Sequence, residues 1–238
     1  MLTIGFEEAV YSDLLQESRT LSISLPDGFD SSGNERYHLL ILLDGNSYFE
    51  SVSSVARHLS RRNSLPKLII AAIHNTERER DFTPYKIQMK RENKTGGGNQ
   101  FLAFINQELI PYMERSYPIS EMKILVGHSL GGFLATHDFL TKQTDIDAYL
   151  ILDPSIPWEK SMMMKRVAEA TPGPQRALYL ATAWHEDQSR WLQRHQELVH
   201  LLHENQNELT IQHKLFEKED HRSLPLIACY EGLKWLFQ

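Results

Sequence analysis

A serine between two glycines is the first residue of this sequence whose setting suggests chemistry. Residues 124–132 read ILVGHSLGG, an apolar run that gives way to glycines and then continues as FLATHDFL. Gly127, Ser129 and Gly131 match the nucleophile-elbow pattern G-x-S-x-G, in which a tight strand-to-helix turn raises a serine hydroxyl above the edge of a sheet. Glycines two positions away on either side let neighbouring backbone approach without a Cβ clash. The pattern therefore predicts that Ser129 is a nucleophile, with an ordinary glycine-rich turn as the alternative.

A serine hydroxyl is a weak nucleophile at neutral pH, so it requires a general base that a carboxylate orients. In proteins that use this turn, the acid and then the histidine follow the serine along the chain. Of the eleven histidines, His221 lies in FEKEDHRSL, between the last predicted strand and the last predicted helix. His195, His200 and His203 lie on one polar helical pattern, and most of the histidines have such ordinary explanations. Chain order therefore predicts His221 as the base, with a plain loop histidine as the alternative.

The carboxylate that orients this base is expected after the penultimate strand. The run RALYLATAW at 176–184 ends there, and Glu186 and Asp187 follow it. Either carboxylate could accept a hydrogen bond from the imidazole and stabilise its cation. Asp187 also precedes the helical run QSRWLQ, where it has an ordinary explanation as an N-cap. That explanation favours Glu186 as the acid and leaves Asp187 as the alternative.

The oxyanion that forms on a substrate carbonyl requires hydrogen-bond donors. The backbone N–H of Leu130 follows the nucleophile at a helix N-terminus, where the helix dipole also favours negative charge. A second donor is expected after an early central strand, and LLDGNSYF at 42–49 carries Asp44, Gly45 and Asn46 at that place. We predict the backbone N–H of Asn46 as the second donor. An ordinary Asp-Gly turn is the alternative.

Strand and helix patterns alternate along nearly the whole chain and would position these residues. Apolar or alternating runs predict strands at 19–26 (an edge strand), 37–45, 67–75, 121–129, 148–155, 176–184 and 209–217. Helical spacing is found at 51–62, 101–117, 130–143, 162–170, 189–205 and 223–237. Strands separated by helices predict an α/β fold with a mostly parallel sheet covered on both faces. No repeat or composition shift divides the chain, so we expect one domain over residues 1–238.

Composition excludes several classes of partner. The net charge is −6 and no long basic block is present, so neither nucleic acid nor an anionic membrane is an expected partner. The apolar runs LLILL and LIIAAI are too short to span a bilayer and fit buried parallel strands. The N-terminal residues carry no basic segment, so no secretory signal is predicted and a cytoplasmic location is expected. Cys229 is the only cysteine, which excludes an internal disulfide and favours a buried apolar role.

Residue order and spacing argue against two other kinds of site, a phosphate-binding loop and a zinc site. In ENKTGGGNQ, Lys94 and Thr95 precede the glycines, whereas a phosphate-binding loop places these residue types after them. In HQELVHLLHE the zinc motif H-E-x-x-H is absent, and His195 and His200 are five positions apart. We therefore expect neither a metal nor a cofactor.

With these residues placed, the chain resembles the putative esterase family of α/β-hydrolases, which includes esterase D and the siderophore esterases. The resemblance runs nearly from end to end, through LLILLDGNSYF, IHNTERERDFTP, VGHSLGG, DPSIPW and EDHRSLPLIACYEGLKWLF. Within this family, the chain is most similar to bacterial siderophore-esterase-like serine hydrolases. The resemblance implies an α/β-hydrolase fold, with Ser129 as nucleophile, His221 as base and oxyanion amides on Leu130 and Asn46.

The acid is also part of the resemblance. In that family it often is a glutamate three residues after the small residue that ends a strand. Ala183 and Glu186 fit that spacing, with alanine in place of the commoner glycine. Some siderophore-esterase relatives resemble a Ser–His dyad more than a triad, so a dyad is a further alternative.

The rim of the site is predicted from aromatic residues near strand ends and from one loop. The aromatic candidates for the substrate pocket are Tyr48, Trp158 and Trp184, with a core role as the alternative. The resemblance places the loop ERERDFTP at the rim, where Arg80 could meet an anionic part of a substrate. An Arg–Asp pair with Asp81 that holds a long loop is the alternative. The insertion at 154–175 is too short for a full cap domain, which predicts an open site.

These residues together predict a serine carboxylic-ester hydrolase that works through an acyl-enzyme. The expected partner is a small-molecule ester, either a siderophore ester or a small acyl or aryl ester. An acyltransferase, or a ligand-binding member of the same fold without catalysis, is the alternative.

Overall fold

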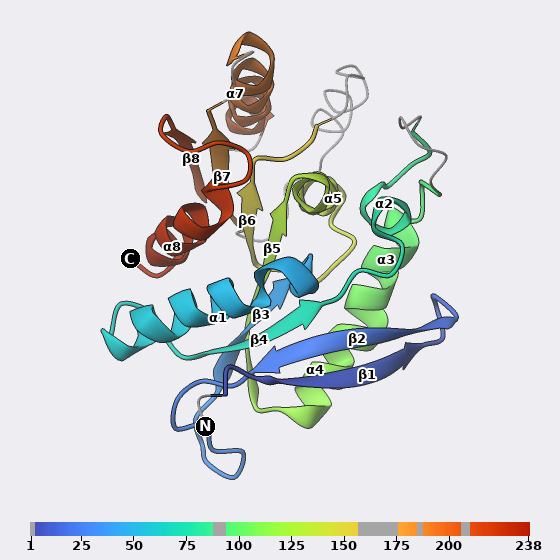
Figure 1. The fold of residues 1–238 in the computed structure, drawn as a ribbon, viewed down its shortest axis with the longest axis vertical. Coiled ribbons are helices and arrows are strands. Elements are labelled where there is room, and N and C mark those ends of the chain that lie inside the picture. Colours follow the sequence, from blue (N-terminus) through green and yellow to red (C-terminus); the bar gives the residue numbers. More distant parts are fainter. Residues whose placement is uncertain (1–2, 88–93, 157–175, 185–187, 206–209) are drawn as a thin grey trace.

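The computed structural model describes residues 3–87, 94–156, 176–184, 188–205 and 210–238. Its strands form one sheet in the order β1-β2-β4-β3-β5-β6-β7-β8 (Figure 1). The strand bounds are β1 Phe6–Ser12, β2 Glu17–Ser24, β3 Tyr37–Leu42, β4 Leu68–Ile73, β5 Ile119–His128, β6 Ala148–Leu152, β7 Ala177–Ala183 and β8 Thr210–Phe216. The pairs β1–β2 and β2–β4 are antiparallel, and the pairs from β4 to β8 are parallel. The predicted mostly parallel sheet is therefore confirmed.

Helices cover both faces of this sheet, as the sequence predicts. The helix bounds are α1 Gly45–Arg61, α2 Arg78–Phe82, α3 Gly98–Phe104, α4 Ile110–Ser116, α5 Leu130–Thr141, α7 Gln188–Asn205 and α8 Leu224–Leu236. On one face, α1 and α8 pack on alternate residues of the central strands, such as Leu40 and Leu150. On the other face, the helices from α2 to α5, together with α7, cover residues such as Ile41 and Ile151. The arrangement is that of an α/β-hydrolase, with helices on both sides of the sheet (Figure 1) and an apolar layer between the sheet and the helices on each side.

The N-terminal region differs from the prediction. Residues 19–26 were expected to form an edge strand, but β2 is an inner strand because β1 pairs along its whole length. The sequence FEEAVYS alternates in exposure along β1, as expected for an edge strand with one solvated face. The prediction of β2 as an edge is therefore wrong, and β1 takes that place.

The predicted helix 101–117 is interrupted by one turn of π-helix. This turn covers Ile105–Leu109 and separates α3 from α4. It lies immediately before Pro111, which has no N–H to donate and whose ring clashes with the carbonyl four residues earlier. A wider turn before the proline relieves both problems, since π-turns insert one residue into the helical ladder.

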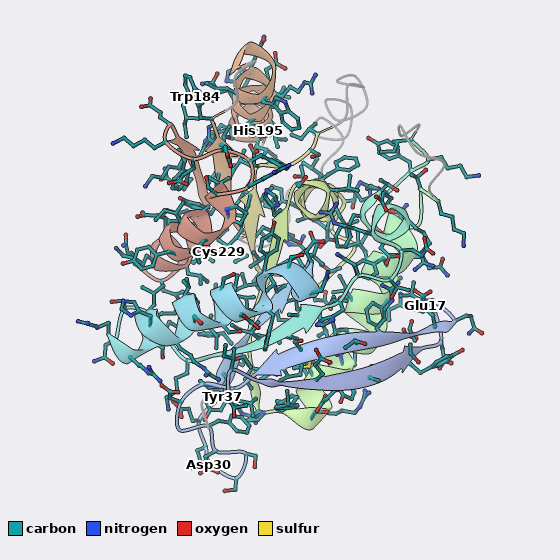
Figure 2. All side chains as sticks on the ribbon, viewed as in Figure 1. Glu17, Asp30, Tyr37, Trp184, His195 and Cys229 are labelled. Atoms are coloured by element: carbon teal, nitrogen blue, oxygen red, sulfur yellow. The ribbon has the colours of Figure 1, made fainter. Side chains whose placement is uncertain are left out.

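Cys229 is buried on α8, where Figure 2 labels it, and burial raises the pKa of its thiol to about 12. This confirms the predicted apolar role. Among the described residues, no helix combines the length and the apolar character needed to cross a membrane. The predicted insertion falls mostly on residues 157–175, which lie outside the described residues, as does Trp158.

Candidate active site

Ser129 lies in the tight turn between β5, which ends at His128, and α5, which begins at Leu130. Its backbone has φ 57° and ψ −117°, a conformation that costs free energy for any residue with a Cβ. Hydrogen bonds hold this strained residue in place. Its N–H donates to Leu152 O at 3.0 Å, and its carbonyl accepts from Ser155 N at 2.9 Å. The side chain remains partly accessible.

The glycines of the elbow are needed for close backbone contact. A Cβ built on Gly127 would lie 2.4 Å from the carbonyl oxygen of Gly131, a distance that Cβ atoms essentially never show. A Cβ built on Gly132 would lie 3.1 Å from the Cα of Pro154. The start of α5 can therefore pack against β5 and against the segment after β6 only because side chains are missing at these positions.

His221 lies in the turn between β8 and α8 and reaches the nucleophile. Its Nε2 is 3.0 Å from Ser129 Oγ, within hydrogen-bond distance. Its Nδ1 is 2.5 Å from Oδ2 of Asp153, whose carboxylate is completely buried. The described residues thus bring Ser129 and His221 together as the sequence predicts, and they add a carboxylate that the sequence analysis did not select.

Asp153 is a carboxylate at the imidazole of His221 in a position that the sequence did not predict. The prediction placed the acid after β7, at Glu186 or Asp187, and both residues lie outside the described residues. Asp153 follows β6 instead, at the start of DPSIPW. Because β6 is the immediate neighbour of β5, its end lies only about 4.8 Å from the strand that carries Ser129, whereas β7 is two strands away. The sequence does contain a signal for this carboxylate, because an Asp-Pro pair follows directly after a buried strand.

Both oxygens of the Asp153 carboxylate have partners. Oδ1 accepts a hydrogen bond from Ala183 N at 3.1 Å, and Oδ2 faces His221. The backbone N–H of Asp153 donates to Ala181 O at 2.8 Å. The φ of 43° is one that aspartate tolerates better than most residues. The backbone at the end of β7 therefore fixes Asp153 through hydrogen bonds to both the main chain and the side chain of this residue.

The predicted oxyanion residues lie at two helix N-termini that are close together. Leu130 begins α5, and Asn46 is the second residue of α1. The N–H groups in the first turn of a helix have no intrahelical acceptor. A Cβ built on Gly131 would lie 3.4 Å from Oδ2 of Asp44, so the two helix starts are close neighbours. The roles of the Leu130 and Asn46 amides stay predictions, since no bound anion tests them.

Asp44 is the residue that clamps the start of α1. It has φ 56° and a buried carboxylate, which Arg78 binds with Nε at 2.6 Å and Nη2 at 2.9 Å. Asn75 Nδ2 adds a hydrogen bond of 2.5 Å. Gly45 follows with no room for a side chain, because a Cβ there would lie 2.8 Å from the carbonyl carbon of Ala72. Hydrogen bonds to Asp44 and close packing at Gly45 therefore fix this loop more firmly than an ordinary Asp-Gly turn.

A second histidine stands beside the base. The rings of His128 and His221 have centroids 4.5 Å apart, and His128 Nδ1 is 2.9 Å from the hydroxyl of Tyr48. Burial, and then the nearby His221, lower the pKa of His128 to about 4. Burial and the charge of Asp44 raise the pKa of Tyr48. Tyr48, predicted as a pocket residue, thus supports His128 from behind the reacting groups.

Arg80 and Trp184 were also predicted as pocket residues. Arg80 Nη2 lies 2.5 Å from Glu17 and its Nε 2.8 Å from Asp81, and the Glu17 carboxylate raises the pKa of the guanidinium. These contacts match the alternative explanation, in which an Arg–Asp pair holds the loop. Trp184, labelled in Figure 2, is 45% exposed, and its backbone N–H donates at 2.7 Å to the carbonyl of Glu219, two residues before His221.

Two residues of α7 near the site were not predicted from the sequence. The ring of Trp191 lies 6.4 Å from that of His221. His195, which was grouped with polar helix residues, is labelled on α7 in Figure 2 and is completely buried. Its Nδ1 is 2.8 Å from Thr182 Oγ1 and its Nε2 3.1 Å from the carbonyl of Pro154, next to the acid. The helical spacing of Trp191, His195 and Leu198 was the signal that could have identified this buried face.

The chain is similar in sequence to two named esterases. The chain is 30% identical over 169 residues to the ferri-bacillibactin esterase BesA of Bacillus subtilis. The aligned region covers 63% of this chain and 58% of that protein. It is 29% identical over 156 residues to a siderophore enterobactin esterase of Emericella nidulans, covering 57% and 51% of the two chains. The match thus spans little more than half the length of these curated relatives.

The fold has a close counterpart among solved structures. The crystal structure of an IroE-like serine hydrolase from Shewanella oneidensis superposes with a TM-score of 0.88 and 30% identity, over 98% of this chain and 80% of that one. The family model described as Putative esterase matches residues 12–227, which include the elbow, the segment after β6 and the histidine turn. On this match across most of its length, the chain belongs to the Putative esterase family.

Proposed function

We propose that this protein is a serine carboxylic-ester hydrolase that works through an acyl-enzyme, with Ser129 as nucleophile, His221 as base and Asp153 as the orienting acid. One observation carries the proposal. A continuous line of contacts runs from Ser129 Oγ to His221 Nε2 at 3.0 Å and from His221 Nδ1 to Asp153 Oδ2 at 2.5 Å. This is the arrangement that activates a serine hydroxyl in serine hydrolases of unrelated folds.

In the first half of the reaction, Ser129 Oγ attacks the ester carbonyl carbon and its proton passes to His221 Nε2. The ionised Asp153 stabilises the imidazolium that results, and because it contacts Nδ1 it holds the ring in the tautomer whose Nε2 can accept a proton. Asp153 is completely buried and bonded to Ala183, so its position needs no adjustment during the reaction. His221 then donates the proton to the departing alkoxide, and an alcohol leaves.

The carbonyl oxygen becomes negative as the tetrahedral intermediate forms. The amides of Leu130 and Asn46, at the adjoining starts of α5 and α1, are the donors that we assign to it. In the second half of the reaction, His221 removes a proton from water, which attacks the acyl carbon. Ser129 Oγ leaves, takes back a proton from His221, and the carboxylic acid is released.

The substrate class that we propose is a small ester of the siderophore type. Support comes from two relatives whose names give ferri-bacillibactin and enterobactin as substrates, and from the similarity to the IroE-like serine hydrolase. Small acyl and aryl esters are the simplest substrates with the same scissile bond. An acyltransferase would use the same acyl-enzyme, but would need an alcohol or amine acceptor in place of water.

A p-nitrophenyl acyl series and a cyclic catecholate triester would test this function on the wild type, Ser129→Ala, His221→Asn and Asp153→Asn variants. A fluorophosphonate probe followed by peptide mass spectrometry would locate the nucleophile. We expect wild-type turnover, a single label on Ser129 and loss of both in Ser129→Ala. An unlabelled wild type, or full activity in Ser129→Ala, would remove the proposal. Accumulation of an acylated added alcohol in place of free acid would favour the acyltransferase.

A further inference from the structure

A second hydroxyl touches the nucleophile. Ser155 Oγ lies 3.1 Å from Ser129 Oγ, and the side chain of Ser155 is half-buried. The acid–base chemistry described above makes no use of this contact. Ser155 is two residues after Asp153, so one short segment after β6 brings both an acid and a hydroxyl to the same nucleophile.

The direction of this hydrogen bond follows from the protonation of the neighbouring groups. His221 Nδ1 faces a carboxylate, which accepts hydrogen bonds when ionised, so the ring proton is on Nδ1 and the lone pair of Nε2 can accept a hydrogen bond. The single proton of Ser129 is then donated to His221 Nε2. Because Ser129 has no other hydrogen to give, the O–H of Ser155 must be the donor in the pair of hydroxyls.

The backbone holds Ser155 in this position. Its N–H donates to the carbonyl of Ser129 at 2.9 Å, so Ser155 is bonded to the same residue by its main chain and its side chain. The carbonyl of the preceding Pro154 faces Nε2 of the buried His195 at 3.1 Å, and Pro154 packs against Gly132 at the start of α5. A hydroxyl on so constrained a segment is directed at Ser129 Oγ by the fold.

We infer that Ser155 is a catalytic residue, a hydrogen-bond donor that stabilises the negative charge on Ser129 Oγ when this oxygen attacks the acyl carbon and again when it departs. The inference rests on the proposed function, since it assigns a role in that reaction. In attack, the C–O bond forms while the proton of Ser129 moves to His221 Nε2. In deacylation the same bond breaks, and Oγ carries charge until His221 returns a proton.

The distance between the two hydroxyls suits such a role. At 3.1 Å the contact is longer than the 2.7–2.8 Å typical of O–H···O bonds, whereas bonds to a charged oxygen are shorter and about twice as strong. The bond can therefore tighten as charge develops on Oγ. An interaction that is stronger in the transition state than in the free enzyme accelerates the reaction. It would act on both half-reactions, as the oxyanion amides do, but on Ser129 Oγ and not on the carbonyl oxygen.

The test compares Ser155→Ala, which removes the hydroxyl, with Ser155→Thr, which keeps it at the same atom position. The rate constant of fluorophosphonate labelling measures attack by Ser129, and the burst and steady-state phases with a p-nitrophenyl ester separate acylation from deacylation. We expect labelling, acylation and deacylation all to slow by about tenfold in Ser155→Ala. Ser155→Thr should recover most of each rate, and thermal unfolding should show both variants folded.

The outcomes separate this inference from the proposed function. If the wild type is labelled at Ser129 and Ser155→Ala reacts within twofold of its rate, Ser155 has no catalytic role and the esterase proposal stands. If Ser155→Thr is as slow as Ser155→Ala, packing rather than the hydroxyl is responsible, and the inference fails. If the wild type neither reacts with the fluorophosphonate nor hydrolyses the ester, the proposed function itself is contradicted, and so is the role of Ser155.

Discussion

The imidazole rings of His128 and His221 lie with their centroids 4.5 Å apart and their planes tilted by 40°. His221 reaches Ser129, while His128 is 7% exposed and turns its Nδ1 to Tyr48. Because burial lowers the pKa of His128 to about 4, its ring is neutral at the pH where a serine hydrolase works. A neutral neighbour adds no positive charge that would oppose protonation of His221 during the reaction.

The lowered pKa of His128 predicts a loss of stability in weak acid. The unfolded chain binds a proton at this histidine below pH about 6.5, whereas the folded protein binds it only near pH 4. The contribution of His128 to the free energy of unfolding should therefore be at its maximum above pH 6.5 and should be lost as the pH decreases from 6.5 to 4. A shift of this size corresponds to about 3 kcal/mol. Urea unfolding at pH 7.5, 6, 5 and 4.5 would measure the decrease.

His128→Asn is the control for this pH dependence, because asparagine does not titrate. Its free energy of unfolding should change less between pH 7.5 and 4.5 than that of the wild type. Some dependence should remain, since burial also lowers the pKa values of His38 and His213. An identical pH dependence in the variant and the wild type would show that His128 is not the responsible group.

Replacement of Asp153 by asparagine should abolish most of the activity. The amide would keep the shape of the carboxylate but favour the wrong tautomer of His221, and we expect kcat to fall by about 10³- to 10⁴-fold. Glu186→Gln is the matched comparison, because it removes a carboxylate from the position that the sequence analysis preferred. We expect its kcat to stay within twofold of the wild type. A larger loss in Glu186→Gln than in Asp153→Asn would return the acid to the segment after β7.

Two arginines of α2 provide a comparison between positioning and stability. Arg78 binds the carboxylate of Asp44 with two nitrogens, at the helix start that carries the Asn46 amide. Arg78→Lys removes this paired contact, so kcat should fall about tenfold with little change in KM, as expected when only transition-state stabilisation is lost. Arg80→Lys disturbs only the contacts with Glu17 and Asp81, and should lower the melting temperature while kcat remains unchanged. Equal kcat values for the two variants would contradict a link between Arg78 and the oxyanion site.

Thr182 should contribute to stability through the buried His195 and the partly buried His213. Its hydroxyl is 2.8 Å from both His195 Nδ1 and His213 Nε2, and His195 in turn faces the carbonyl of Pro154. Thr182→Val keeps the volume and leaves two polar nitrogens without this partner, so the free energy of unfolding should fall by about 1–3 kcal/mol in urea titrations. Thr182→Ser keeps the hydroxyl and should lose less than half of that. Equal losses in the two variants would assign the effect to packing of the methyl group.

Several features of the site follow from short stretches of sequence. Ser129 was identifiable because the elbow is local, and five consecutive residues specify a turn in which Gly127 has no room for a Cβ atom. His221 was identifiable because the turn between the last strand and the last helix has a constant place in this topology. The alternation of strand and helix patterns was sufficient to predict a parallel sheet with two covered faces.

Other features depend on contacts between residues that are distant in the chain. Only the order of strands in the sheet brings the end of β6 beside the end of β5, and so places Asp153 at His221 and Ser155 at Ser129. Only the packing of α7 on β7 shows that His195 is buried beside Thr182. Sequence by itself determined the class of fold and predicted Ser129 and His221 as nucleophile and base, because these have local or ordered signals. Only the tertiary structure brought Asp153 and Ser155 to this pair, because neighbouring positions in a sheet are set by strand pairing and not by distance along the chain.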